Sequence, residues 1–316
     1  ALALEPWLAA TNPAPWPTAP PGSGALVYDE TYGGLVSRVS LTDPAADYGN
    51  GRYNDHHFHY GYLLYATAVA CRADAKFCDR HRGAIAAIAA DIAAPPGLGS
   101  AARFPTARCK DFYDGHSWAS GLFPMADGKS QESSSEAANG YYGAMLALEA
   151  LGDRQGAAWA RLLLSMEVRA AQWYWQVPST SAVYDPALVR DTRMVGVVGA
   201  LDVRAATWFG QQVEYVHGIN IMPVTPLTEA LLQPAFVAEE YAQLRARTAV
   251  MDVNWAGFAV AAHAILDPRA ARSELSAVTA FDNGNSRTNV LHWIATRPAA
   301  GAEEDGAEES ATAARA

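Results

Sequence analysis

The densest group of polar side chains occupies residues 54–61, NDHHFHYG, immediately before a stretch of apolar residues at helical spacing. If the first turn is helical, Asp55 and His59 stand four residues apart on one face. A carboxylate and an imidazole can then exchange a proton. Asn54 or Asp55 could instead cap the helix by accepting a hydrogen bond from a backbone N–H. These residues alone leave both interpretations of Asp55 open.

The three histidines of this segment suggest a metal site as an alternative. Zinc ligands on a helix are usually four residues apart, whereas His56 and His57 are adjacent and point to different faces. No HExxH pattern is present. We therefore predict no metal and no cofactor. A metallohydrolase built on His56, His57 and His59 is the alternative, which dialysis against EDTA would reveal.

A second polar cluster, SQESSSEA, occupies residues 130–137. Ser133 and Glu136 fit a capping box at the start of a helix over residues 137–151. That interpretation does not account for Glu132, which precedes the helix. A carboxylate near a helix N-terminus is stabilised as the anion, which suits a general base. Because the sequence contains neither GxSxG nor a P-loop, paired carboxylates are the best catalytic candidates.

A third cluster, DFYDGHSWASG at residues 111–121, combines two carboxylates, three aromatic rings and a histidine. Sugar rings bind proteins by stacking on aromatic planes while polar side chains bond the hydroxyls. The chain holds nine Trp and fourteen Tyr, enough to line a sugar-binding groove. The cluster therefore favours a carbohydrate ligand.

The charge balance favours a neutral ligand. The chain carries 33 acidic and 23 basic residues, a net charge of −10. Five of the acids and one Arg lie in the last sixteen residues, so the remainder carries 28 against 22, or −6. Nucleic acids and anionic membranes attract clustered Lys and Arg, so we predict neither as a partner. No apolar run of about 18 residues predicts a membrane span.

The periodicity predicts an all-α body between two tails. Six of the eighteen prolines fall before Gly24, so residues 1–24 are predicted to form an extended arm or linker. The acidic residues 299–316 are predicted to be a disordered tail. Within residues 25–298 the apolar residues recur at helical spacing in seven stretches, over 60–73, 85–93, 137–151, 157–175, 236–249, 257–266 and 288–296. Only residues 25–39 and 194–203 alternate as strands do.

The three cysteines, Cys71, Cys78 and Cys109, do not determine a redox compartment. An odd number cannot pair completely, and no CxxC motif suggests zinc. Cys71 and Cys78 could pair or remain free thiols. No signal peptide is visible at the start of the chain.

The polar clusters, in their order, resemble the signature of glycoside hydrolase family 81. The matching stretches are NDHHFHYGY, DGHSWASGL and QESSSEAANGYYG, followed by MVGVVGALDVRAATWFG, YVHGINIMPVTPLTEALL and FDNGNSRTNVLHWIATRP. Together with YDETYGGLVS at residues 28–37, these stretches span residues 28–298. The later motifs are closer in sequence to the plant and algal branch. The sequence differs from the family's pattern in having Tyr32 where a Trp is expected. The family's usual N-terminal β-sandwich has no counterpart in it.

The resemblance implies an (α/α)6 barrel over residues 25–298 with endo-β-1,3-glucanase activity by inversion. It implies Asp55 as the general acid and Glu132 as the general base, with Glu136 and His59 in the cleft. We expect the two catalytic carboxyl groups to stand roughly 6.5–9.5 Å apart. The substrate-binding residues carried over from the motifs are Tyr60, Asp114, His116, Trp118, Asn139 and His217.

The predicted partner is a β-1,3-glucan, bound by a monomer that acts outside the cell or in the cell wall. A different class of protein remains open, a glucan-recognition protein that binds oligosaccharide without turning it over. The retention of both carboxylates argues against it. A reducing-sugar assay on laminarin separates the two.

Overall fold

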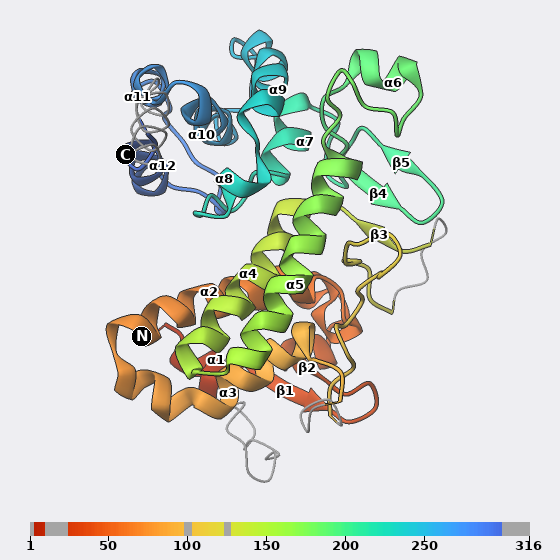
Figure 1. Ribbon diagram of the computed structural model, residues 1–316, viewed down its shortest axis with the longest axis vertical. Coiled ribbons are helices and arrows are strands. Elements are labelled where there is room, and N and C mark those ends of the chain that lie inside the picture. The colour runs from red at the N-terminus through yellow and green to blue at the C-terminus, as the bar shows by residue number, and fades with distance from the viewer. Residues whose placement is uncertain (1–2, 10–24, 98–102, 123–127, 299–316) are drawn as a thin grey trace, which may run out of the picture. The chain divides into compact units, whose positions relative to one another are not determined.

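The computed structural model describes residues 3–9, 25–97, 103–122 and 128–298, which are mostly helical (Figure 1). The chain divides into two compact units, one of residues 1–171 and 197–203, the other of residues 172–196 and 204–316. The mostly helical fold predicted from the periodicity is confirmed. The predicted acidic tail and residues 10–24 of the predicted arm lie outside the described residues.

The first unit is built on four long helices. They are α2 (His56–Ala73), α3 (Ala75–Ala93), α4 (Ser134–Leu151) and α5 (Arg154–Ala170). The shorter elements are α1 (Glu5–Ala9), β1 (Leu26–Asp29), β2 (Gly34–Ser37), β3 (Ser130–Gln131), β4 (Val197–Gly199) and the 3-10 turns η1 (Val39–Leu41) and η2 (Ala46–Arg52). The strands β1 and β2 form an antiparallel hairpin, and β3 pairs antiparallel with β4. The stretch predicted as a strand over residues 25–39 contains β1 and β2, and the stretch over residues 194–203 contains β4. The strand β3 lies outside both stretches.

Part of the predicted arm is folded. Residues 5–9 form α1, in which Pro6 lies in the first turn, where a missing N–H costs nothing. Leu8 is 1% exposed, and Glu5 pairs with His81 of α3 at 3.1 Å. The prediction of an extended arm is therefore wrong for this segment, because one buried leucine and the contact between Glu5 and His81 attach it to the unit.

Helices α2 and α4 approach closely because glycines line their contact. A Cβ atom added at Gly61 would lie 2.7 Å from the Cα of Gly140, and one added at Gly140 would lie 2.7 Å from the carbonyl oxygen of His57. Real Cβ atoms do not come this close, so any larger residue would push the helices apart. The close approach matters for function because the candidate catalytic residues lie at the N-terminal ends of these two helices.

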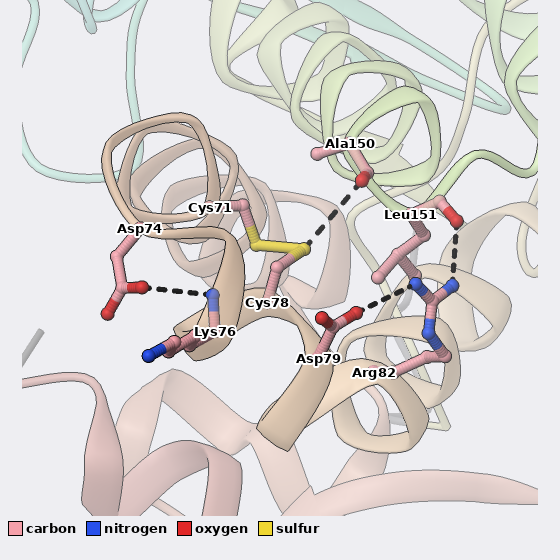
Figure 2. The surroundings of a disulfide bond; sticks show 8 residues. All are labelled: Cys71, Asp74, Lys76, Cys78, Asp79, Arg82, Ala150 and Leu151. Atoms are coloured by element: carbon pink, nitrogen blue, oxygen red, sulfur yellow. Dashed lines mark hydrogen bonds and ion pairs between the residues drawn. A yellow bond between two sulfur atoms is a disulfide. The ribbon is translucent and has the colours of Figure 1, made fainter.

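The pairing of cysteines that the sequence left open is a disulfide between Cys71 and Cys78, whose Cα atoms are 4.7 Å apart (Figure 2). It joins the end of α2 to the start of α3. Between the two cysteines Asp74 caps α3, accepting from the backbone N–H of Lys76 at 2.9 Å. Arg82 of α3 donates to the carbonyl of Leu151 at 2.7 Å, which attaches this corner to the end of α4.

Reducing this disulfide is expected to lower the free energy of unfolding by about 2 kcal/mol, the value for closing so short a loop in the unfolded chain. The double variant C71S/C78S should show the same loss in urea titrations, without further sensitivity to dithiothreitol. Cys109 is the free cysteine, so C109S should respond to dithiothreitol as the wild type does. Equal unfolding midpoints with and without dithiothreitol would contradict the prediction.

The second unit contains shorter helices, α6 (Pro186–Asp191), α7 (Val213–Ile219), α8 (Thr228–Leu231), α9 (Pro234–Ala246), α10 (Ala256–Leu266), α11 (Pro268–Leu275) and α12 (Arg287–Ala295). The π-helical turn η4 (Ala171–Trp175) and the strand β5 (Val203–Arg204) lie where the chain passes between units. The core helix α10 is apolar on nearly all sides, and the indole N–H of Trp293 in α12 donates to its Ala261 carbonyl at 2.9 Å. Within the described residues, no helix is both long and apolar enough to cross a membrane.

Candidate active site

Asp55 immediately precedes α2, with its backbone in the left-handed region (φ 59°, ψ 21°). Its side chain makes no capping hydrogen bond, so the capping interpretation is wrong. Its backbone N–H instead donates to the carbonyl of Ala119 at 3.0 Å. Asp and Asn are the residues other than Gly that adopt this conformation most readily. The strand-like segment containing Ala119 therefore holds the backbone of Asp55, and the helix does not use its carboxylate.

Burial raises the pKa of Asp55 well above its ordinary range, and the negative charges of Glu136 and Glu132 raise it further. Desolvation disfavours the charged form, and a neighbouring carboxylate repels a second negative charge. Three carboxyl groups, one before α2 and two around the start of α4, therefore interact. A carboxyl group with a raised pKa retains a proton that it can donate.

Glu132 and Glu136 lie on either side of the start of α4. Ser133 is the N-cap, and its side chain accepts from the backbone N–H of Glu136 at 3.3 Å, as the capping box predicted. The carboxylate of Glu136 also accepts a hydrogen bond from the hydroxyl of Tyr62 in α2 at 3.0 Å. Glu132 follows β3 directly, and both glutamates are partly buried. The strand and the cap thus fix their backbones.

His59 lies one turn into α2 and is partly buried. Burial lowers its pKa to about 4, and the charge of His56 contributes to the shift. Its ring Nδ1 lies 3.4 Å from the amide nitrogen of Asn50. His59 is therefore neutral near pH 7, and its role in the cleft stays a prediction.

The other two histidines of the cluster face different partners. The Nδ1 atom of His56 lies 2.6 Å from Asp91, and its Nε2 atom lies 3.0 Å from the carbonyl of Asn50. The Nε2 atom of His57 lies 3.0 Å from the hydroxyl of Tyr141 in α4. The three rings do not converge. Among the residues that the structure describes, no three His, Cys, Asp or Glu side chains are arranged to hold a metal ion.

The DGHSW segment forms a turn that leads into a buried strand-like stretch. The backbone N–H of Asp114 donates to the carboxylate of Asp111 at 3.1 Å, and Asp114 remains partly exposed. His116 is 2% exposed, and its ring packs edge-on against Trp118, with 4.4 Å between centroids. Of the three predicted sugar contacts in this segment, Asp114 is thus the most accessible. The contacts of His116 and Trp118 with sugar rest on the resemblance.

Three further residues predicted to bind substrate are buried. Tyr60 is 1% exposed and donates its hydroxyl proton to the carbonyl of Leu35 at 2.5 Å. Asn139 donates to the carbonyl of Ser135 within α4 at 2.9 Å. His217 belongs to the second unit, where its Nδ1 atom lies 2.9 Å from the buried Glu240. These hydrogen bonds give all three side chains structural partners inside their own unit.

The sequence reasoning missed the buried charges near the site. Asp91 is fully buried and bonded to His56, to Arg108 at 3.3 Å and to the backbone N–H of Leu35. Burial opposes its ionisation, but the charges of His56 and Arg108 lower its pKa overall. Glu167 is buried in a similar way beside Lys110. In the sequence, Asp91 and Glu167 are each an isolated acidic residue within an apolar helical stretch. That pattern could have indicated a buried charge.

A pair of neighbouring carboxyl groups, one of which keeps its proton because its pKa is raised, is typical of glycoside hydrolases. The model of the glycosyl hydrolase family 81 C-terminal domain matches residues 19–294, and the chain belongs to this family. The resemblance deduced from the motifs is therefore confirmed.

Named relatives agree with this membership. The chain is 32% identical to a glucan endo-1,3-beta-D-glucosidase of Glycine max, over 93% of this chain and 43% of the relative. It is 33% identical to a protein of the same name from Acetivibrio thermocellus, over 88% of this chain and 36% of the relative. Because these identities are nearly equal, the plant-like branch stays a prediction.

Among solved structures, the chain resembles a mutant form of a glycoside hydrolase family 81 protein from Clostridium thermocellum. The TM-score is 0.74 at 30% identity, covering 85% of this chain and 37% of that chain. The similarity supports the helical fold of the family's catalytic domain. The chain spans less than half the length of each of these three proteins.

Proposed function

We propose that this chain hydrolyses internal β-1,3-glucosidic bonds of β-glucan with inversion, with Asp55 as the general acid and Glu132 as the general base. The observation that supports the proposal most strongly is the raised pKa of Asp55, caused by burial and by the charges of Glu136 and Glu132. Inverting glycosidases need one protonated and one ionised carboxyl group at the same pH. The names of the relatives supply the substrate class.

In the proposed reaction Asp55 gives its proton to the glycosidic oxygen as the bond to the anomeric carbon breaks. A water attacks that carbon from the opposite face, and Glu132 takes the proton that the water loses. Glu132 lies just before the N-terminus of α4, whose dipole favours the anion. Glu136 supports the reaction by keeping Asp55 protonated. No step requires a metal ion.

The remaining predictions belong to the same proposal. Asp114, His116, Trp118, Tyr60, Asn139 and His217 are proposed to bind the sugar or to shape its site, in a chain that acts as a monomer. The disulfide between Cys71 and Cys78 supports a location outside the cell or in the cell wall, because disulfides persist in oxidising compartments.

Digestion of laminarin tests the function directly. The purified chain should release oligosaccharides of several lengths and new reducing ends, at the same rate before and after dialysis against EDTA. Binding without new reducing ends would support the glucan-recognition alternative. Activity lost on dialysis and restored only by Zn²⁺ or Mn²⁺ would support the metallohydrolase.

Inversion makes a separate prediction about the first product. Proton NMR of a fresh digest should show the α-anomer at the new reducing end before mutarotation mixes the two forms. Water would then have attacked the face opposite the departing β-linked oxygen. The β-anomer appearing first would indicate a covalent glycosyl-enzyme and would exclude Glu132 as a base acting on water.

A further inference from the structure

A buried ion pair lies next to the candidate site and has no part in the proposed chemistry. The Nζ atom of Lys110 is 2.7 Å from the carboxylate of Glu167 in α5, and the two side chains are 0% and 2% exposed. Burial opposes the ionisation of Glu167, but the charges of Lys110 and His116 and the hydrogen bonds it accepts lower its pKa overall. A buried carboxylate of this kind is costly unless its partners satisfy it.

The other hydrogen bonds that this carboxylate accepts come from one residue. Ser117 donates its backbone N–H to both oxygens of Glu167, at 3.0 and 2.9 Å, and its hydroxyl to one of them at 3.0 Å. The hydroxyl of Ser117 also accepts from the side-chain amide of Gln131 at 3.2 Å. Glu167 therefore anchors the start of the segment 117–120, and Gln131 immediately precedes Glu132.

The segment 117–120 contacts the backbones that carry both catalytic candidates. The carbonyl of Ala119 accepts from the backbone N–H of Asp55 at 3.0 Å. The backbone N–H groups of Ala119 and Ser120 both donate to the carbonyl of Ser130 in β3, at 3.0 and 3.1 Å. The segment 117–120 thus joins the residue before α2 to the strand before Glu132.

We propose that Glu167, neutralised by Lys110, is a positioning residue that fixes segment 117–120 and thereby the spacing of Asp55 and Glu132. The inference rests on the proposed function for its effect on catalysis. Catalysis is sensitive to such spacing, since a misplacement of about 1 Å can cost about 10²-fold in rate. The same hydrogen bonds also make a prediction about backbone protection that does not depend on activity.

The test compares the wild type with E167Q in the whole chain. E167Q keeps the volume of the side chain but leaves Lys110 unpaired and Ser117 with a weaker acceptor. On laminarin, kcat should fall about 10- to 100-fold while KM and the Kd for a laminari-oligosaccharide stay within about twofold. Hydrogen exchange should accelerate at the amides of Asp55, Ala119 and Ser120 more than elsewhere in the first unit.

Two further variants separate positioning from stability. K110M/E167M removes both charges, so it leaves no unpaired buried charge and should fold even if E167Q does not. It also removes the acceptor of Ser117, so kcat should remain low and the same amides should exchange faster. The control is E149Q, which breaks the exposed ion pair between Glu149 of α4 and Arg161 of α5. E149Q should change neither kcat nor the hydrogen exchange of these amides.

The proposal would be overturned if E167Q and K110M/E167M both kept the wild-type kcat and the wild-type hydrogen exchange at these amides. It would also be overturned if hydrogen exchange accelerated equally throughout the first unit. A wild type inactive on laminarin would instead refute the proposed function. The exchange at Asp55, Ala119 and Ser120 would then still decide whether Glu167 holds this segment.

Discussion

The variant D55N is expected to lose about 10²- to 10⁴-fold in kcat on laminarin, the range for removing a general acid. Asn has the same shape as Asp and tolerates the left-handed backbone conformation that position 55 requires (φ 59°). The hydrogen bond from the backbone N–H to Ala119 should also remain. Circular dichroism should therefore show an unchanged fold, and initial rates of reducing-sugar release should show the loss.

The control for this variant is D47N, which removes an exposed carboxylate from a residue in the same backbone region (φ 49°). It should keep its activity within about twofold. If D55N retained wild-type kcat, Asp55 would not be the acid. If D47N lost as much activity as D55N, the loss in D55N could not be assigned to proton donation.

The thermal stability of D55N should also differ from the wild type with pH. The folded-state pKa of Asp55 is raised, so its contribution to stability is fully present below its unfolded pKa. That contribution is lost as the pH rises through the folded pKa. Asn at position 55 cannot ionise. The Tm of D55N should therefore match or exceed the Tm of the wild type at pH 7. The difference between the two Tm values should shrink towards pH 3.

The variant E132Q is expected to lose a comparable 10²- to 10⁴-fold, about the range for a general base, with little change in oligosaccharide affinity. A base acts on the attacking water, so its removal affects the transition state more than binding. Calorimetry with a laminari-oligosaccharide and single-turnover rates measure the two effects separately. Azide should restore turnover to E132A, because azide attacks without a general base.

The matched comparison for E132Q is E136Q, which lies on the other side of the cap of α4. Glu136 raises the pKa of Asp55, so its removal should move the basic limb of the kcat/KM profile to lower pH. Azide should not rescue E136A. Near-normal turnover of E132Q, together with azide rescue of E136A, would transfer the role of base to Glu136.

The longer helices were largely predictable because they depend on local information. The apolar stretches over residues 60–73, 137–151 and 257–266 lie within α2, α4 and α10. The sequence also predicted that Ser133 begins α4, because a cap bonds to a residue only three positions away. The shorter helices α1, α6, α7, α8 and α11 lie outside the predicted stretches. The formation of α1 depends on contacts of Glu5 and Leu8 outside the segment.

The sequence by itself determined the chemical types at the site: an aspartate before α2, two glutamates around the start of α4, and motifs specific enough to indicate the family. Only the tertiary structure decided the surroundings of these groups. Asp55 proved not to be a cap, and its pKa is raised by burial and by glutamates distant in sequence. Hydrogen bonds within one helical turn can be inferred from spacing, whereas desolvation and charge repulsion depend on neighbours that folding brings together.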